Sequence, residues 1–120
     1  MYIYDINLER RSIAVKTSDG QCILTPDNGT LTHINRMRKI TEAREIDENI
    51  NRLPNSGDSY TFHGRDIYAY TGARLAAGII NFKEIGPEVS VDDIVELNIT
   101  EAVKEGDIIT GTIDILDVRF

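Results

Sequence analysis

The sequence predicts an α/β protein, in which a part that mixes strands and helices is followed by a β part. Three observations lead to this class. A hairpin signal is centred on Asp19-Gly20, a long amphipathic stretch covers residues 61–80, and the apolar residues alternate with a period of two after Gly86-Pro87. Helices and strands have different hydrophobic periods, so a change of period indicates a change of element. With 120 residues, 41% of them hydrophobic, the chain can build one modest core.

The first two strands are predicted by a turn signal. Short apolar runs at residues 12–16 and 21–25 flank Ser18-Asp19-Gly20. Asp-Gly tolerates the positive φ of a tight turn, so the two runs are expected to pair as a β-hairpin. The sequence Pro-Asp-Asn-Gly at residues 26–29 then ends the second strand, and its residue types are first of all those of a turn.

A short helix and a third strand are expected next. Residues 30–38 place Leu31, Ile34 and Met37 at helical spacing, which predicts one apolar face. Residues 41–46 read as a strand. The following segment up to Ser59 is rich in Asn, Asp, Pro and Gly and is expected to be mostly loop.

Residues 61–80 are expected to form a helix of about four turns. Apolar or small side chains recur every four residues, at Ile67, Thr71, Leu75 and Ile79. A second set of small residues predicts a smooth face that can lie close against a sheet: Ala69, Gly72, Ala73, Ala76 and Ala77.

The last part of the chain reads as the start of a β-domain, with a boundary near residues 86–91. One strand is expected to contain Val95, Leu97 and Ile99, and the next to run over residues 109–115. A lone pair of strands is only marginally stable in water. We therefore expect that further strands belong to this domain and are absent from the chain.

The charge of the chain excludes nucleic acid as an expected partner. The net charge is -7, whereas neutralising phosphates requires clustered Lys and Arg. The one basic group, Arg36, Arg38 and Lys39, is expected at a helix C-terminus, where cations oppose the negative end of the dipole. No apolar run approaches the roughly 20 residues that span a bilayer, and a single cysteine fits a reducing compartment. We expect a soluble, cytoplasmic protein with no membrane partner.

His63 is the strongest single candidate for chemistry. It precedes Gly64 and the predicted helix start, where unpaired N–H groups and the positive dipole end can hold an oxygen-bearing ligand. A capping or packing role is the alternative. Arg65 and Asp66 could orient His63 or simply cap the helix. Because His33 is the only other histidine, a His-rich metal site is not expected.

Several short blocks are more specific together than any one of them. They are residues 10–13 (Arg-Arg-Ser-Ile), 25–32 (Thr-Pro-Asp-Asn-Gly-Thr-Leu-Thr), 61–67 (Thr-Phe-His-Gly-Arg-Asp-Ile), 76–78 (Ala-Ala-Gly) and 85–87 (Ile-Gly-Pro). In this order they resemble the SAM hydroxide adenosyltransferases, which hydrolyse S-adenosyl-L-methionine (SAM) to adenosine and are related to the bacterial fluorinase and chlorinase. The match covers most of residues 9–120, and the chain resembles an internal fragment of such an enzyme.

The resemblance implies a fold in two parts. Members of the family have an N-terminal α/β domain and a C-terminal β-barrel-like domain, and they typically form trimers with substrate between neighbouring subunits. Residues 1–88 would then be the later part of the N-terminal α/β sheet domain. Residues 89–120 would be the first strands of the C-terminal β-barrel-like domain, which is truncated. A homotrimer is expected.

The resemblance also implies a hydrolytic Asp-Arg-His set. His63 matches the histidine, Arg10 most nearly matches the arginine, and Arg11 is the adjacent possibility. The aspartate has no match. The family reads Asp-Pro-Gly-Val-Gly-Thr before the arginine, whereas residues 4–9 read Tyr-Asp-Ile-Asn-Leu-Glu, so Asp5 is out of register.

Four further positions match residues that contact substrate in the family: Thr61, Phe62, Asp117 and Phe120. The implied reaction is attack of water on the 5′ carbon of SAM, which expels methionine as a neutral thioether. An arginine beside the water favours hydroxide, and a neutral histidine can hold or accept the proton. Neither a metal nor a cofactor is needed, so SAM is expected as substrate only.

Two alternatives remain. The missing aspartate and the cut β-domain are also consistent with an inactive fragment or split-gene remnant that has only a structural or assembly role. A SAM-dependent halogenase is less favoured, because those relatives tend to carry Tyr-Ser where this chain has His63-Gly64.

Overall fold

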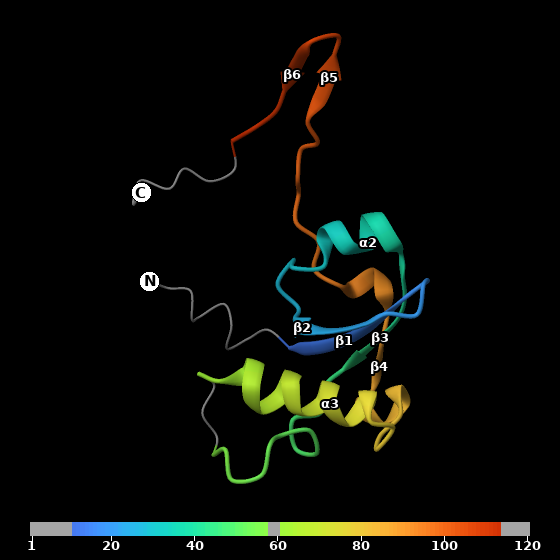
Figure 1. The fold of residues 1–120 in the computed structure, drawn as a ribbon, viewed down its shortest axis with the longest axis vertical. Helices are drawn as coiled ribbons and strands as arrows, with labels where there is room; N and C mark the ends of the chain where they lie inside the picture. The colour runs from blue at the N-terminus through green and yellow to red at the C-terminus, as the bar shows by residue number, and fades with distance from the viewer. Residues whose placement is uncertain (1–10, 58–60, 114–120) are drawn as a thin grey trace.

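A computed structural model of the chain describes residues 11–57 and 61–113. Its main feature is a four-stranded antiparallel sheet with strand order β2-β1-β3-β4. The strands are β1 (Ser12–Thr17), β2 (Cys22–Pro26), β3 (Ile40–Glu45) and β4 (Glu88–Val89). Helix α2 (Thr32–Arg38) lies on one face of the sheet, and η1 (Gly64–Ala69) with α3 (Tyr70–Ala76) lies on the other (Figure 1). The expected α/β class is confirmed.

The predicted hairpin and third strand are also confirmed. β1 and β2 pair antiparallel, with Ser12 opposite Pro26 and Lys16 opposite Cys22. β3 pairs antiparallel with the other edge of β1. β1 is therefore an interior strand of the sheet, and its backbone is hydrogen-bonded on both sides.

The side chains of β1 are buried on both faces of the sheet. Because side chains alternate along a strand, Ile13 and Val15 face the α2 side and Ala14 faces the α3 side. The cluster on the α2 side also contains Leu31, Ile40 and Ala43. The cluster on the α3 side also contains Ile46, Ile67, Phe82 and Ile85. The sheet is thus the middle layer between two helical layers.

Helix α2 is confirmed, but one of its expected contacts is wrong. Leu31 is buried and Ile34 is half-buried, whereas Met37 is 80% exposed. Two steps of three residues rotate the apolar stripe by about 120° around a helix axis, so Met37 leaves the face that Leu31 occupies. Two of the three expected cations lie in the last turn of this helix.

The helix expected over residues 61–80 is confirmed in its first part. It opens as a π-helix in η1 and continues as α3, with Ile67 and Thr71 buried. Gly78 then adopts a φ of 73°, a conformation that commonly ends a helix, and Ile79 is left 69% exposed. Neither this helix nor any other in the described ranges is long and apolar enough to cross a membrane.

The small residues of this helix do not pack on the sheet, so that expectation is wrong. They are exposed or half-buried: Ala69, Gly72, Ala73, Ala76 and Ala77. The side that packs on the sheet carries Ile67, Tyr68 and Leu75. Removing larger apolar side chains from water stabilises the fold more than burying alanine methyl groups, which explains this orientation.

After the helix, the chain returns to the edge of the sheet. η2 (Phe82–Ile85) begins with a capping box, in which the Asn81 side chain accepts from the Glu84 N–H and the Glu84 carboxylate accepts from the Asn81 N–H. β4 then pairs with β3, and η3 (Val91–Asp93) follows. The first sheet therefore extends to residue 89, while the division into domains at residue 88 stays a prediction.

Gly86 lies where two backbone segments approach closely. A Cβ at this position would lie 2.0 Å from the carbonyl oxygen of Glu45. Around it, the Glu45 N–H donates to the Pro87 carbonyl at 2.9 Å and the Asp47 N–H donates to the Ile85 carbonyl at 3.0 Å. The backbone leaves no room for a side chain here.

The strand expected over residues 95–99 is wrong. The N–H of Val95 donates to the Asp27 carboxylate, and the N–H of Leu97 donates to the Thr32 hydroxyl, each at 2.9 Å. These N–H groups bond to side chains of another segment and therefore do not enter a strand ladder.

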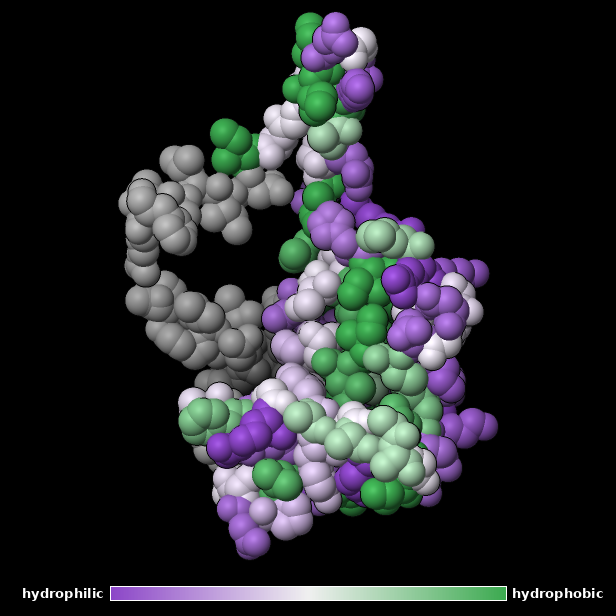
Figure 2. All heavy atoms as spheres, viewed as in Figure 1, coloured by the Kyte–Doolittle hydropathy of each residue, from purple (hydrophilic) through white to green (hydrophobic). Residues whose placement is uncertain are grey.

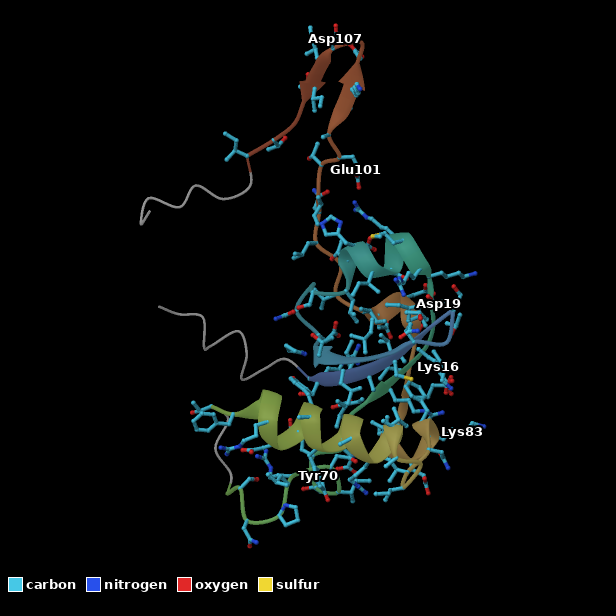
Figure 3. All side chains as sticks on the ribbon, in the orientation of Figure 1. Lys16, Asp19, Tyr70, Lys83, Glu101 and Asp107 are labelled. Carbon is cyan, nitrogen blue, oxygen red and sulfur yellow. The ribbon has the colours of Figure 1, made fainter. Side chains whose placement is uncertain are left out.

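The chain pairs again only in a separate hairpin, formed by β5 (Val103–Glu105) and β6 (Ile108–Thr110). This hairpin projects away from the main sheet and its helices, with Asp107 at its tip (Figures 1 and 3). The apolar side chains of the hairpin lie exposed at that end of the molecule (Figure 2): Val103, Ile108 and Ile109. A second, small sheet after the first is confirmed, and Ile115 lies outside the described residues.

We expect Gly86→Ala to lower the free energy of unfolding by about 1–3 kcal/mol, because the new methyl group must displace the backbone of Glu45. Gly72→Ala is the matched control. Nothing lies within 4 Å of a Cβ at Gly72, and alanine favours a helix, so this variant should be as stable as the parent or more stable. Urea unfolding of the two variants measures both effects. Equal midpoints would contradict the close approach.

Candidate functional site

A polar cluster lies on the face of the sheet that η1 and α3 cover. Ser12 is the first residue of β1, and Glu48 lies in the loop after β3. His63 directly precedes η1, and Tyr68 lies within η1. Three segments that are far apart in the sequence therefore bring polar side chains to one place.

Glu48 is the centre of this cluster. Its Oε1 lies 2.9 Å from Nε2 of His63 and accepts from the Ser12 hydroxyl at 3.5 Å. Its Oε2 accepts from Nη2 of Arg52 at 3.1 Å, in an ion pair between residues four apart. Both carboxylate oxygens are thus held, which fixes how the carboxylate faces the imidazole.

The loop that carries Glu48 is held by Asn51. The Asn51 side chain is 1% exposed, and its Nδ2 donates to the carbonyls of Asp47 at 3.0 Å and Ile85 at 2.8 Å. Its Oδ1 accepts from Nη1 of Arg74 at 3.2 Å. The loop is therefore tied to both η2 and α3, and tertiary contacts set the position of Glu48.

The hydroxyls of Ser12 and Tyr68 are hydrogen-bonded to each other at 2.9 Å. Burial raises the pKa of Tyr68 above its ordinary value of 10.0, and the negative charge of Glu48 raises this pKa further, while the hydrogen bond with Ser12 opposes the shift. Tyr68 is therefore a neutral phenol near pH 7. The rings of Tyr68 and His63 lie side by side, with centroids 6.3 Å apart.

A buried acid lies one turn into the same helix. The Asp66 side chain is 0% exposed, and its Oδ1 accepts from Nε of Arg65 at 2.6 Å. This hydrogen bond is the main cause that lowers the pKa of Asp66 below its ordinary value of 3.8; the positive charges of Arg65 and Arg52 add to it, and burial opposes it. The Arg65 guanidinium also lies 4.6 Å from the centroid of the Phe62 ring. Arg65 thus links the buried acid to an exposed aromatic side chain.

Arg11 belongs to a different set of contacts. Its Nε donates to Oδ2 of Asp27 at 3.0 Å, and its Nη2 donates to the Asp93 carbonyl at 3.3 Å. The Asp27 carboxylate is 4% exposed. Asp93 belongs to η3, whose Val91 packs on the α2 side of the sheet. Successive residues of an extended chain point to opposite faces, so the Arg11 guanidinium is directed away from the cluster that contains Ser12.

The loop at residues 27–32 also holds the segment that leads to the second sheet. The Thr32 hydroxyl donates to the Gly29 carbonyl at 2.7 Å and accepts from the N–H of Leu97. The Leu97 side chain lies close to Gly29. A Cβ built on Gly29 would lie 2.4 Å from Cγ of Leu97. Glu101, above α2 in Figure 3, accepts from Arg36 at 2.9 Å. Residues 27–32 are therefore more than a turn, because they anchor residues 95–97.

The predicted site residues fall into two groups. The structure describes Arg11, Thr61, Phe62 and His63, whereas Arg10, Asp117 and Phe120 lie outside the described residues. Thr61 and Phe62 are exposed beside the half-buried His63. Arg11 contacts Asp27 and Asp93, and His63 contacts Glu48. The catalytic and binding roles of all seven residues stay predictions.

No sequence pattern marks Glu48, which is one of 20 acidic residues and lies in a loop. Tyr68 follows His63 by five residues, a spacing that an α-helix places about 140° apart around its axis, so the expected helix did not predict their proximity. Within the described residues, no group of three or more His, Cys, Asp or Glu side chains is arranged to hold a metal ion.

Comparison with known proteins assigns the family. The model of the SAM hydroxide adenosyltransferase N-terminal domain matches residues 4–86. The chain belongs to the SAM hydroxide adenosyltransferase family. It is 35% identical over 96 residues to the (R)-S-adenosyl-L-methionine hydrolase of Methanocaldococcus jannaschii. It is 34% identical over 113 residues to the protein of the same name from Salinispora tropica.

The fold comparison agrees with this assignment. The crystal structure of an uncharacterized conserved protein from Thermotoga maritima superposes with a TM-score of 0.75 at 31% identity, covering 92% of this chain and 40% of that one. The two hydrolases match 80% and 93% of this chain, but only 33% and 42% of their own lengths. This member of the family therefore spans less than half the length of the relatives it matches.

The lowered pKa of Asp66 implies an acid-sensitive contribution to stability. A carboxyl group whose pKa is lower in the folded than in the unfolded state contributes its full stabilisation above the unfolded value, and the contribution is lost as the pH falls through the folded value. We expect the difference in urea midpoint between the parent and Asp66→Asn to be largest above about pH 5 and to shrink below about pH 4. Asp92→Asn, at an exposed acid, is the control. A difference that stays constant from pH 7 to pH 3 would contradict the assignment.

Proposed function

We propose that this chain takes part in the hydrolysis of SAM to adenosine and L-methionine, by attack of water at the 5′ carbon of the ribose. The observation that carries the proposal is the contact between Nε2 of His63 and Oε1 of Glu48, which holds an imidazole beside the exposed Thr61 and Phe62. The family membership and the names of the two hydrolases support the same reaction.

The chemistry of a sulfonium substrate explains why a histidine suffices at this position. When the C5′–S bond breaks, its electron pair returns to sulfur and methionine leaves as a neutral thioether, so no acid is required on that side. The attacking water must lose a proton as its oxygen bonds to C5′, and a neutral imidazole can accept that proton near pH 7. Neither a metal nor a cofactor is part of this proposal.

Arg10 is the arginine that we assign to the water. The Arg11 guanidinium is already engaged by the buried Asp27 carboxylate and by the Asp93 carbonyl. A cation beside the water would favour its hydroxide form and stabilise the developing charge. Because Arg11 already has a structural role on the α2 side, we assign the role beside the water to Arg10.

Thr61 and Phe62 are proposed to contact the substrate, together with Asp117 and Phe120. Phe62 is 53% exposed, which suits an aromatic surface on which a flat adenine ring can stack. We further propose that the protein acts as a cytoplasmic homotrimer, the assembly that the family resemblance implies. Nucleic acid is not proposed as a partner, because the net charge of -7 opposes it.

The reaction is tested by incubating the purified protein with SAM in ¹⁸O-labelled water. We expect adenosine and methionine in equal amounts, with the label in the 5′ hydroxyl of adenosine. His63→Ala should lower the rate by about 10²- to 10⁴-fold, the usual contribution of a general base. His33→Ala, which removes the other histidine from the exposed face of α2, is the matched control and should leave the rate unchanged. Formation of neither product by the parent protein would refute the proposal.

The two arginines are separated by a second experiment. We expect Arg10→Ala to lower turnover by about 10²- to 10³-fold, as removal of a stabilising donor does elsewhere. Arg11→Ala should instead lower the free energy of unfolding by about 3–5 kcal/mol, because it leaves the Asp27 carboxylate buried without its cation. Turnover per folded molecule and urea unfolding measure the two effects. The reverse pattern would assign the catalytic role to Arg11.

A second candidate function is assembly without catalysis. It is favoured by residues 4–9, which lack the glycine-rich aspartate segment of the family, and by the exposed apolar side chains of the β5–β6 hairpin. A folded protein that forms no adenosine would support it. Chloride-dependent formation of chlorodeoxyadenosine in the same assay would instead support the halogenase alternative.

A further inference from the structure

We propose that Arg65 is a positioning residue for Phe62, whose ring it holds in one orientation so that the ring presents a flat surface to the adenine of the substrate. The identity of the ligand rests on the proposed function, whereas the contact between the two side chains does not. Phe62 is 53% exposed and lies just before η1. An exposed side chain without a neighbour changes rotamer rapidly, so a binding surface at this position needs a support.

The support is the guanidinium of Arg65. Its Cζ lies over the ring of Phe62, 4.6 Å from the ring centroid. Residues three apart lie on the same side of a helical turn, which brings these two side chains together. A planar guanidinium is attracted to an aromatic face and stacks on it. It can cover only one face, so the surface that remains for a ligand is the opposite face and the edges of the ring.

Asp66 fixes the guanidinium in this place. The Asp66 side chain is 0% exposed, its Oδ1 accepts from Nε of Arg65 at 2.6 Å, and its Oδ2 accepts from Nη2 at 3.3 Å. Two hydrogen bonds to one carboxylate define the plane of a guanidinium as well as its position. The backbone N–H of Asp66 donates to the carbonyl of Phe62 at 2.8 Å, so the carboxylate and the ring are attached to the same helical turn. The ring, the guanidinium and the buried carboxylate therefore form one unit.

The charge of this unit suits a sulfonium substrate. SAM carries a positive sulfonium, which an arginine without a counter-ion would repel. The negative charge of Asp66 offsets the positive charge of Arg65, so the unit has no net charge. Adenine can then stack on the uncovered face of Phe62. Because the ring is already held, binding does not have to immobilise it, and the entropy loss of ordering a free side chain is avoided.

The proposal is tested by calorimetry of adenosine binding to the full chain. We expect Arg65→Ala to raise the Kd of adenosine by about 2- to 10-fold, the effect of ordering one free side chain. Arg65→Lys should raise it nearly as much, because lysine keeps the charge but can neither form the fork nor stack in the same way. In a Phe62→Leu background, Arg65→Ala should have no further effect, since Arg65 acts through the ring.

Arg38→Ala is the matched control. It removes an equal charge from an exposed ion pair with Asp19 on the α2 side of the sheet, and it should leave the Kd unchanged. Where the parent hydrolyses SAM, Arg65→Ala should raise KM by the same factor as the Kd and leave kcat nearly unchanged, because the stack contributes equally to binding of substrate and transition state.

An effect of Arg65→Ala that is equally large in the Phe62→Leu background would overturn the proposal, as would a parent-like Kd for Arg65→Lys or a parent protein that binds no adenosine. A second measurement leaves Arg65 and Asp66 in place. The Hε signal of Arg65 in the NMR spectrum should move downfield in Phe62→Leu, because the ring no longer shields it, and an unchanged signal would contradict the stacking.

The outcomes separate this proposal from the proposed function. Adenosine binding with the expected pattern, but without hydrolysis of SAM, would refute the proposed function alone. Hydrolysis of SAM with additive effects of the Arg65 and Phe62 substitutions would refute the role of Arg65 alone.

Discussion

Burial of β1 on both faces is the constraint on which the rest of the structure depends. Ile13 and Val15 pack under α2, while Ala14 leaves space for Ile67 from the opposite helix. A slip of one residue would exchange the two faces and place the small and large side chains in the wrong layers, so the register of the strand is strongly specified. The two helical layers can therefore attach to the sheet in one arrangement only.

The same alternation separates two polar systems at the start of β1. Arg11 extends to the α2 side, where its guanidinium and the buried Asp27 hold the segment around residues 93–95. Ser12 extends to the α3 side, where its hydroxyl meets Glu48 and Tyr68. One end of one strand thus anchors the path toward the second sheet and also supports the cluster around His63. A change in the position of β1 would therefore alter both the contacts of Arg11 and the cluster around His63.

The cluster around His63 is built from interactions that stabilise one another. Asn51 holds the loop of Glu48 against η2 and α3, and Arg52 occupies the second carboxylate oxygen. Asp66, buried one turn further along the helix, keeps Arg65 beside the exposed Phe62. Charged groups are therefore paired wherever burial would otherwise be costly, and exposed aromatic surface remains next to the histidine. Glu48 therefore holds the imidazole beside an exposed aromatic side chain.

Local patterns in the sequence were sufficient for several of the elements and for the family. The hairpin around Asp19-Gly20, the strand at residues 40–45, the helix that begins after His63 and the order of the short motif blocks all follow from turn chemistry, periodicity and residue identity over short distances. Three other features depended on side chains distant in sequence. They are the exposure of the alanine face, the irregular conformation of residues 95–99 and the contact between His63 and Glu48. Val95 and Leu97 lie outside any strand because Asp27 and Thr32 take their N–H groups, and Glu48 meets His63 because Asn51 fixes a loop that has no pattern of its own. Hydrophobic periodicity and secondary-structure propensity are properties of one segment. Which distant residues that segment contacts is decided by packing, and only the tertiary structure shows those contacts.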